Sequence, residues 1–121
     1  DLVFPEGLVT INDRAFMNCD SLLSVTLPSS LTSIGSWAFE SATSLVSVAF
    51  PESLNSIGIY AFSGATSLAS VSFQEGLTSI GKRAFHNTLL TEVDVALPAS
   101  LGEEKRHWSY YNCIGYTDLV L

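Results

Sequence analysis

Histidines, cysteines and paired carboxylates are the side chains that would carry catalysis or hold a metal, and this chain offers few of them. Its two histidines, His86 and His107, lie far apart in the chain and in no recognisable catalytic motif. The many serines have no base beside them to activate a hydroxyl. Glu104 and His107 share the i, i+3 spacing of a metal pair, but no further histidine or cysteine ligand lies nearby. We therefore predict a non-enzyme without metal or cofactor.

A 23-residue repeat determines the positions of the remaining side chains. The copies at 8–30, 31–53 and 54–76 follow the template L-x-x-I-G-x-x-A-F-x(5)-L-x-x-V-x-φ-P-x-S, in which φ is Leu or Phe, and the copy at 77–100 follows it with small length changes. A period in the twenties with leucine at fixed offsets is typical of a leucine-rich repeat solenoid, in which stacked turns share one core. We expect a single domain over residues 1–121. It consists of a partial copy at 1–7, full copies at 8–30, 31–53, 54–76 and 77–100, and a degraded copy at 101–121.

The repeat resembles the BspA-like, or treponemal-type, leucine-rich repeats. Three segments with the pattern Ile-Gly-x-x-Ala-Phe carry the match, at 34–39, 57–62 and 80–85, and each precedes a Leu-x-x-Val pattern. The first copy also has the family's cysteine, at Cys19. The resemblance implies a protein at the cell surface or outside the cell that mediates adhesion or protein binding, and it says less about function than about fold. The alternative location is organellar or intracellular, within an assembly.

The template predicts a right-handed β/α superhelix. Leu45, Val48 and Phe50 alternate with small or polar residues, which indicates a strand with one buried face. Stacked copies should give a parallel sheet of about six short strands. On the other side we expect an extended segment, a turn at the glycine and a one-turn helix that directs Phe39 into a stack of core rings. Asn12 replaces that glycine in the first copy, so we expect a left-handed backbone there.

The two cysteines are predicted to be free thiols. Cys19 occupies the repeat position filled by Ala42 and Ala65, and Cys113 occupies the same position four rungs later. Rungs about 4.8 Å apart would separate the two sulfurs by roughly 20 Å, whereas a disulfide needs Cα atoms within about 7 Å. Each cysteine is expected to be a small apolar side chain in the core.

Composition narrows the class of partner. The formal charge is −7 with only five Lys and Arg residues, which argues against nucleic acid and against an anionic membrane surface. No apolar run approaches the ~18–20 residues that span a bilayer. No signal peptide is recognisable and the chain begins inside a repeat, so we interpret the sequence as a fragment or a processed form.

One candidate binding surface is the column formed by the residue before each Ala-Phe pair. Stacking of the rungs should bring these residues together, and Arg, Trp and Tyr are the types most enriched at interface hot spots. The same column can instead be a self-contained cation–π and stacking ladder that stiffens the turns. With the neighbouring isoleucine, the predicted contact residues are Arg14, Trp37, Ile59, Tyr60, Arg83 and Trp108.

The alternative binding surface is the concave face, made by the outward side chains of the strands. It is small and neutral over three rungs and then acidic. A regular Ser/Thr lattice also suggests ice binding, although small β-tolerant residues on an exposed sheet explain it more simply. The residues of this face are Ser24, Thr26, Ser47, Ser70, Ser72, Glu92, Asp94 and Asp118.

These patterns favour a non-catalytic protein-binding or adhesion module of a larger protein, with a protein partner of unknown identity. The alternative is a structural accessory subunit that stays docked in a larger assembly. The low content of charged residues, 14%, is the reason to keep that alternative, because a permanently covered surface needs little charge.

Overall fold

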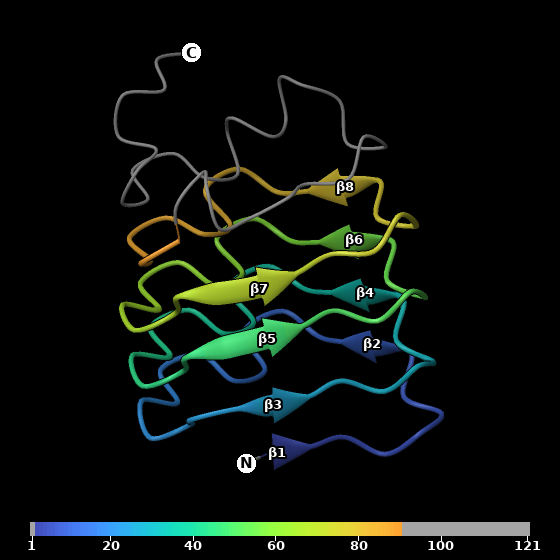
Figure 1. The fold of residues 1–121 in the computed structure, drawn as a ribbon, viewed down its shortest axis with the longest axis horizontal. Coiled ribbons are helices and arrows are strands. Elements are labelled where there is room, and N and C mark those ends of the chain that lie inside the picture. Colours follow the sequence, from blue (N-terminus) through green and yellow to red (C-terminus); the bar gives the residue numbers. More distant parts are fainter. Residues whose placement is uncertain (1, 91–121) are drawn as a thin grey trace.

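The computed structural model describes residues 2–90, which form a regular stack in which each 23-residue copy is one rung (Figure 1). Paired strands are parallel, and their register joins residues 23 positions apart, such as Ile34 with Ile57 and Val48 with Val71. The repeat read from the sequence is therefore the physical repeat of the fold. The strands are β1 (Leu2–Val3), β2 (Thr10–Ile11), β3 (Val25–Thr26), β4 (Ser33–Ile34), β5 (Ser47–Ala49), β6 (Ser56–Ile57), β7 (Ser70–Ser72) and β8 (Ser79–Ile80).

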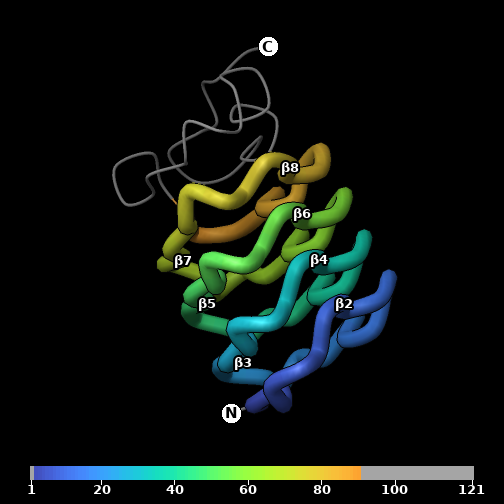
Figure 2. Tube along the Cα trace, turned by 90° about the vertical axis from the view of Figure 1, so that its right-hand side faces the viewer, coloured from blue at the N-terminus to red at the C-terminus, as the bar shows by residue number. Residues whose placement is uncertain are grey.

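The strands lie on two sides of the stack rather than on one. The order β2-β4-β6-β8 makes a continuous four-stranded sheet from the Leu-x-x-Ile segments, for which the sequence predicts only an extended backbone. On the other side β1 pairs with β3 and β5 with β7, and a bridge between Ser24 and Ser47 joins the two pairs. Figure 2 shows the chain as one coil, in which β3, β5 and β7 lie on one side and β2, β4, β6 and β8 on the other.

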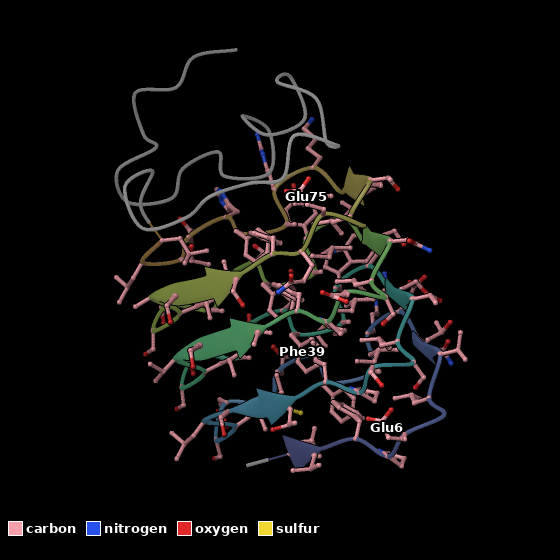
Figure 3. The ribbon with its side chains drawn as sticks, turned by 45° about the vertical axis from the view of Figure 1, so that its right-hand side comes forward. Glu6, Phe39 and Glu75 are labelled. Atoms are coloured by element: carbon pink, nitrogen blue, oxygen red, sulfur yellow. The ribbon has the colours of Figure 1, made fainter. Side chains whose placement is uncertain are left out.

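The core lies between these two sides and is built from repeated apolar columns. Phe39, Phe62 and Phe85 are fully buried and stack nearly parallel, with ring centroids 5.1 Å and 5.4 Å apart. Phe16 extends the stack by 5.4 Å and is half-buried, since the described residues place a ring of the stack on only one side of it. Figure 3 labels Phe39 inside the stack. The predicted column of core rings is confirmed.

The predicted one-turn helices are wrong: residues 2–90 contain no helix, and turns occupy these segments. The reason lies in the backbone hydrogen bonds. The Phe39 N–H donates to the Ala61 carbonyl of the next rung at 2.7 Å, and the Trp37 N–H donates to Ile59 at 2.9 Å. Because these donors are used between rungs, they are not available for the bonds within a segment that a helix needs.

The expectation of a left-handed backbone at Asn12 is also wrong. Among the non-glycine residues described, positive φ angles occur two and six positions further along, at Arg14 and Asn18 and at their counterparts in later rungs. The glycines aligned with Asn12 are explained by the lack of room for a side chain between neighbouring rungs. A Cβ on Gly35 would lie 2.5 Å from the backbone nitrogen of Asp13, so the rungs approach each other too closely for a side chain there.

The thiol of Cys19 is free, as predicted, but it is half-buried, unlike the fully buried Ala42 and Ala65 at the same position of later rungs. Cys19 belongs to the first rung, and the described residues place no rung on its outer side. Cys113 lies outside the described residues.

Candidate binding surfaces

Arg14, Trp37, Tyr60 and Arg83 form one continuous stack, which we call the aromatic ladder. The Arg14 guanidinium carbon lies 4.6 Å from the centre of the Trp37 ring. The Trp37 and Tyr60 rings are nearly parallel, at 4° and 5.9 Å between centroids. Arg83 Nη1 donates to the Tyr60 hydroxyl at 3.4 Å. The structure therefore brings together the four described members of the predicted column.

The backbone under the aromatic ladder is in the left-handed region. The φ angles are 60°, 57°, 58° and 55° from Arg14 to Arg83. Each residue is the third of a four-residue turn, as in Gly35–Ala38, where the Ala38 N–H donates to the Gly35 carbonyl. A type II turn requires positive φ at this place and normally has glycine there. A large residue costs about 1 kcal/mol in that conformation, so backbone preference did not select these side chains.

The aromatic ladder offers ring edges rather than ring faces to a partner. Trp37 has the Arg14 guanidinium over one face and Tyr60 over the other, because these residues belong to the rungs before and after it. Both rings are half-buried. Stacking of a planar ligand on Trp37 is therefore blocked. This arrangement fits the stiffening role predicted for the column, and it leaves edge contacts as the way in which these rings can meet a partner.

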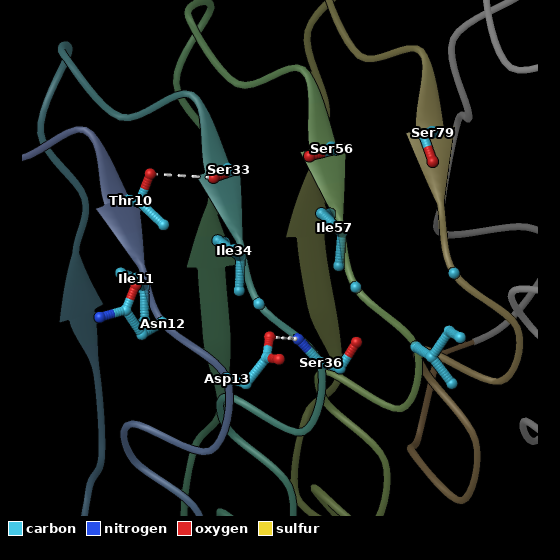
Figure 4. Close-up of a pocket in the computed structure, with 14 residues that line it drawn as sticks. Thr10, Ile11, Asn12, Asp13, Ser33, Ile34, Ser36, Ser56, Ile57 and Ser79 are labelled. Carbon is cyan, nitrogen blue, oxygen red and sulfur yellow. Dashed lines mark hydrogen bonds between the residues drawn. The ribbon is translucent and has the colours of Figure 1, made fainter.

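A groove runs across the rungs beside the aromatic ladder, over the sheet β2-β4-β6-β8. We call it the glycine groove, because Gly35, Gly58 and Gly81 line it and contribute no side chain that would fill it. Its volume is about 640 Å³. One rim carries the hydroxyls of Thr10, Ser33, Ser56 and Ser79, and the other carries Asp13 and Ser36 (Figure 4). Ile59 also lines the groove, and the register of β4 with β6 aligns it with Ser36.

The groove has polar rims and one exposed apolar residue. Ser33 Oγ donates to Thr10 Oγ1 at 3.2 Å, and the Ser36 N–H donates to Asp13 Oδ1 at 2.8 Å, so each rim is held by a contact between the rungs 8–30 and 31–53. Ile59 is 44% exposed. It precedes Tyr60 in the chain, and it therefore links the groove to the aromatic ladder.

Sequence reasoning named Ile59 only as a neighbour of Tyr60 and missed the groove. The signal was present in the sequence: glycine at a fixed position of three successive copies, two residues after a serine in each, predicts a hollow when the copies stack.

The alternative face is also found where it was predicted. Thr26, Ser47, Ser70 and Ser72 are exposed on β3, β5 and β7, and Ser24 is half-buried. We call these residues the strand face. They are flat and polar, but a pair of exposed apolar residues at one edge was missed. This pair is Leu23 and Val46, at 61% and 51% exposure, each directly before the strand segment of its rung.

Four predicted site residues, Trp108, Glu92, Asp94 and Asp118, lie outside the described residues. Within residues 2–90, no group of three or more His, Cys, Asp or Glu side chains is placed to hold a metal ion. No helix in that range is long and apolar enough to cross a membrane.

Comparison with known proteins places the chain in a family. The model of the BspA type leucine rich repeat region matches residues 1–117 in six copies. The chain therefore belongs to the BspA-type leucine-rich repeat proteins, as its Ile-Gly-x-x-Ala-Phe segments suggested. Domains of this kind generally bind proteins and are typically non-catalytic. No curated protein matches the chain.

Two solved structures share the fold. A leucine-rich repeat protein from Bacteroides ovatus is 34% identical, with a TM-score of 0.73, over 91% of this chain and 26% of that one. A leucine-rich repeat protein of T. pallidum is 29% identical, with a TM-score of 0.55, over 91% of this chain and 60% of that one. This chain thus spans about a quarter of the first protein and three fifths of the second.

Proposed function

We propose that this chain is a non-catalytic protein-binding module of a longer adhesive or secreted surface protein, and that its partner lies in the glycine groove against Ile59 and the edges of the aromatic ladder. The observation that carries the proposal is that the two features share the same turns. The groove of about 640 Å³ is lined by Asp13, Ser36 and the exposed Ile59, and the next residue in the chain after each of them belongs to the aromatic ladder.

The residue types support a peptide segment as the bound group. Tyr, Trp and Arg contribute much of the energy of protein interfaces, and an exposed aliphatic side chain supplies apolar area to bury. The serine and threonine hydroxyls on the opposite rim supply donors and acceptors for a peptide backbone. The Trp37 faces are covered, so stacking of a sugar ring is disfavoured and edge contact with a peptide side chain is favoured.

A peptide selection with matched variants tests this proposal. Random peptides displayed on phage are selected on the immobilised full chain, and the dissociation constant of each selected peptide is measured. We expect Ile59→Asp to weaken binding by at least about 2 kcal/mol, since it places a charge at the anchor. Val46→Asp is the control, because Val46 is similarly exposed, at 51%, but lies beside the strand face. Peptides that bind both variants equally, or that lose affinity only with Val46→Asp, would contradict the proposal.

The second candidate function is a structural accessory subunit, and the exposed pair Leu23 and Val46 favours it. Two large apolar side chains more than half exposed in neighbouring rungs suit a permanently covered surface. Size-exclusion chromatography of the isolated chain separates the two functions. A monodisperse monomer supports the recognition module. Aggregation that Leu23→Ser and Val46→Ser abolish supports the subunit.

The proposed surface location has its own test. Antibodies against the chain should label intact cells of the source organism, or the protein should appear in the culture medium. Labelling that requires permeabilised cells would contradict a surface or secreted location and would favour an intracellular or organellar assembly.

A further inference from the structure

One position of the glycine groove changes in chemistry from rung to rung. The register of β2 with β4 and of β4 with β6 aligns Asp13 with Ser36 and Ser36 with Ile59. The Arg14 N–H donates to the Ser36 carbonyl and the Trp37 N–H to the Ile59 carbonyl, both at 2.9 Å, so these three rungs are direct neighbours. The groove therefore presents a carboxylate and an exposed aliphatic side chain two rungs apart.

Asp13 gives the groove its charge. It is exposed, and of the described residues that line the groove it alone is ionisable. Its Oδ1 accepts the Ser36 N–H at 2.8 Å (Figure 4), which holds the carboxylate in place while lone pairs remain for another donor. The guanidinium of the next residue, Arg14, lies over the Trp37 ring. A cationic side chain is thus the complement of this rim, and the net charge of −7 attracts a partner that carries one.

The separation of Asp13 from Ile59 selects the conformation of a bound segment. Neighbouring hydrogen-bonded strands are about 4.8 Å apart, so two rungs span about 9.6 Å. A polyproline II helix has three residues per turn and rises about 9.3 Å in that turn, which places residues i and i+3 over Asp13 and Ile59. In an extended strand, side chains on one face recur about every 6.6 Å, which matches neither one rung nor two.

The hydroxyls of the opposite rim favour the same conformation. Ser56 and Ser79 carry their hydroxyls on that rim. A polyproline II segment has no internal hydrogen bonds, so its carbonyls can accept from these hydroxyls. An α-helix bonds its backbone groups internally, and two of its turns span about 10.8 Å, which is longer than the two rungs. Both the spacing and the polar rim therefore disfavour a helix.

We infer that the glycine groove binds a proline-rich segment that runs across the rungs as a polyproline II helix, with an arginine or lysine at Asp13 and an aliphatic residue three positions away at Ile59. This inference rests on the proposed peptide-binding function and specifies the partner. Proline restricts the free segment to the bound conformation, so little conformational entropy is lost on binding. Trp37 and Tyr60 follow Ser36 and Ile59 in the chain, and their ring edges are the aromatic contacts for the segment.

A peptide series with variable spacing tests the inference. Each peptide is acetylated and amidated, and carries one arginine and one leucine in a polyproline frame. The leucine lies two, three or four positions from the arginine, in both orders. NMR titration of the isotope-labelled full chain gives the dissociation constants. In at least one order, the three-position peptide should bind about fivefold more tightly than the others, since they satisfy Asp13 or Ile59 but not both.

Asp13→Asn removes the charge and keeps an oxygen that can accept the Ser36 N–H. It should weaken the three-position arginine peptide about fivefold and leave a matched glutamine peptide unchanged. The control is Asp20→Asn, which removes an exposed carboxylate of the same rung that does not line the groove. This control variant should bind both peptides as the unmodified chain does.

Equal affinity at all three spacings would overturn the inference, and so would an arginine peptide that Asp13→Asn does not weaken. A series that fails to bind would overturn it as well. The phage-selected peptides distinguish this failure from failure of the proposed function. If they lose affinity with Ile59→Asp, the groove remains a peptide site with a different preference. If they bind independently of Ile59, the proposed function fails together with the inference.

Discussion

Two columns of stacked rings run two residues apart through the turns, one buried and one at the surface. The phenylalanine column (Phe16, Phe39, Phe62 and Phe85) and the aromatic ladder stack with almost the same geometry, at 8° for Phe39 with Phe62 and 4° for Trp37 with Tyr60. Their settings differ: Phe39, Phe62 and Phe85 are fully buried, whereas Trp37 and Tyr60 are half-buried on a left-handed backbone. Equal stacking therefore does not imply equal contributions to stability.

A second left-handed position in the same turns sharpens this contrast. It is occupied by Asn18, Ser41, Gly64 and Asn87, which are small or turn-favouring residues, and three of the four are types that tolerate positive φ well. The aromatic ladder meets the same backbone requirement with Arg, Trp, Tyr and Arg. We infer that the backbone conformation of the turn determines the residue types at the second position, whereas side-chain contacts determine those of the aromatic ladder.

The largest expected effect is at the buried column. Phe62→Ala should lower the free energy of unfolding by about 3–5 kcal/mol, because it leaves a cavity between the rings of Phe39 and Phe85. Urea denaturation followed by circular dichroism measures the loss. Because stability in a repeat stack depends on contacts between neighbouring rungs, more than one rung should lose protection in hydrogen exchange. A loss below about 1 kcal/mol would show that the ring column does not hold the stack together.

A smaller effect is expected at the surface column. Trp37→Ala removes both the Arg14 contact and the stacking on Tyr60, and should cost about 1–2 kcal/mol. The matched control is Trp37→Phe, which keeps a ring and should recover about half of the loss. If Trp37→Ala proves as costly as Phe62→Ala, the distinction between a buried and a surface column does not hold.

The left-handed backbone predicts an unusual order of stability at Tyr60. Tyr60→Gly should be more stable than Tyr60→Ala by about 1 kcal/mol, because glycine adopts positive φ without the steric cost that alanine has. Phe62 provides the opposite control, since it has no positive φ angle, and there glycine should be worse than alanine. The comparison uses the denaturation midpoints of the four variants. A higher denaturation midpoint for Tyr60→Ala than for Tyr60→Gly would contradict the left-handed conformation of this turn.

The smallest effect concerns the Tyr60 hydroxyl. Tyr60→Phe removes the acceptor for Arg83 Nη1, and the bond is long, at 3.4 Å, on a half-buried pair. The cost should be about 0.5 kcal/mol or less. Thermal unfolding of the two proteins side by side measures the difference. A cost above about 1.5 kcal/mol would mean that the hydroxyl belongs to a stronger network than this single bond.

The sequence by itself determined the rungs, their register, the core and the family. When copies stack, the side chains at a repeated apolar position line up in one column that must be buried. The spacing alone therefore predicts that Leu45, Val48 and Phe62 lie inside, and the structure buries all three. The outward position of Ser47 and Ser70 followed from the same alternation. The members of the aromatic ladder were also identified, since a column follows from periodicity whatever its backbone conformation.

The tertiary structure alone decided the form of the turns. The sequence suggested a helix before Phe39 and a left-handed turn at Asn12, because glycine and asparagine are the residues that local preferences associate with positive φ. In the fold, hydrogen bonds between rungs, such as that from the Trp37 N–H to the Ile59 carbonyl, place the positive φ at Trp37 instead. Glycine is required at position 35 because the backbone of the neighbouring rung lies too close for a side chain. These causes act between residues about 23 apart, and no local pattern contains them.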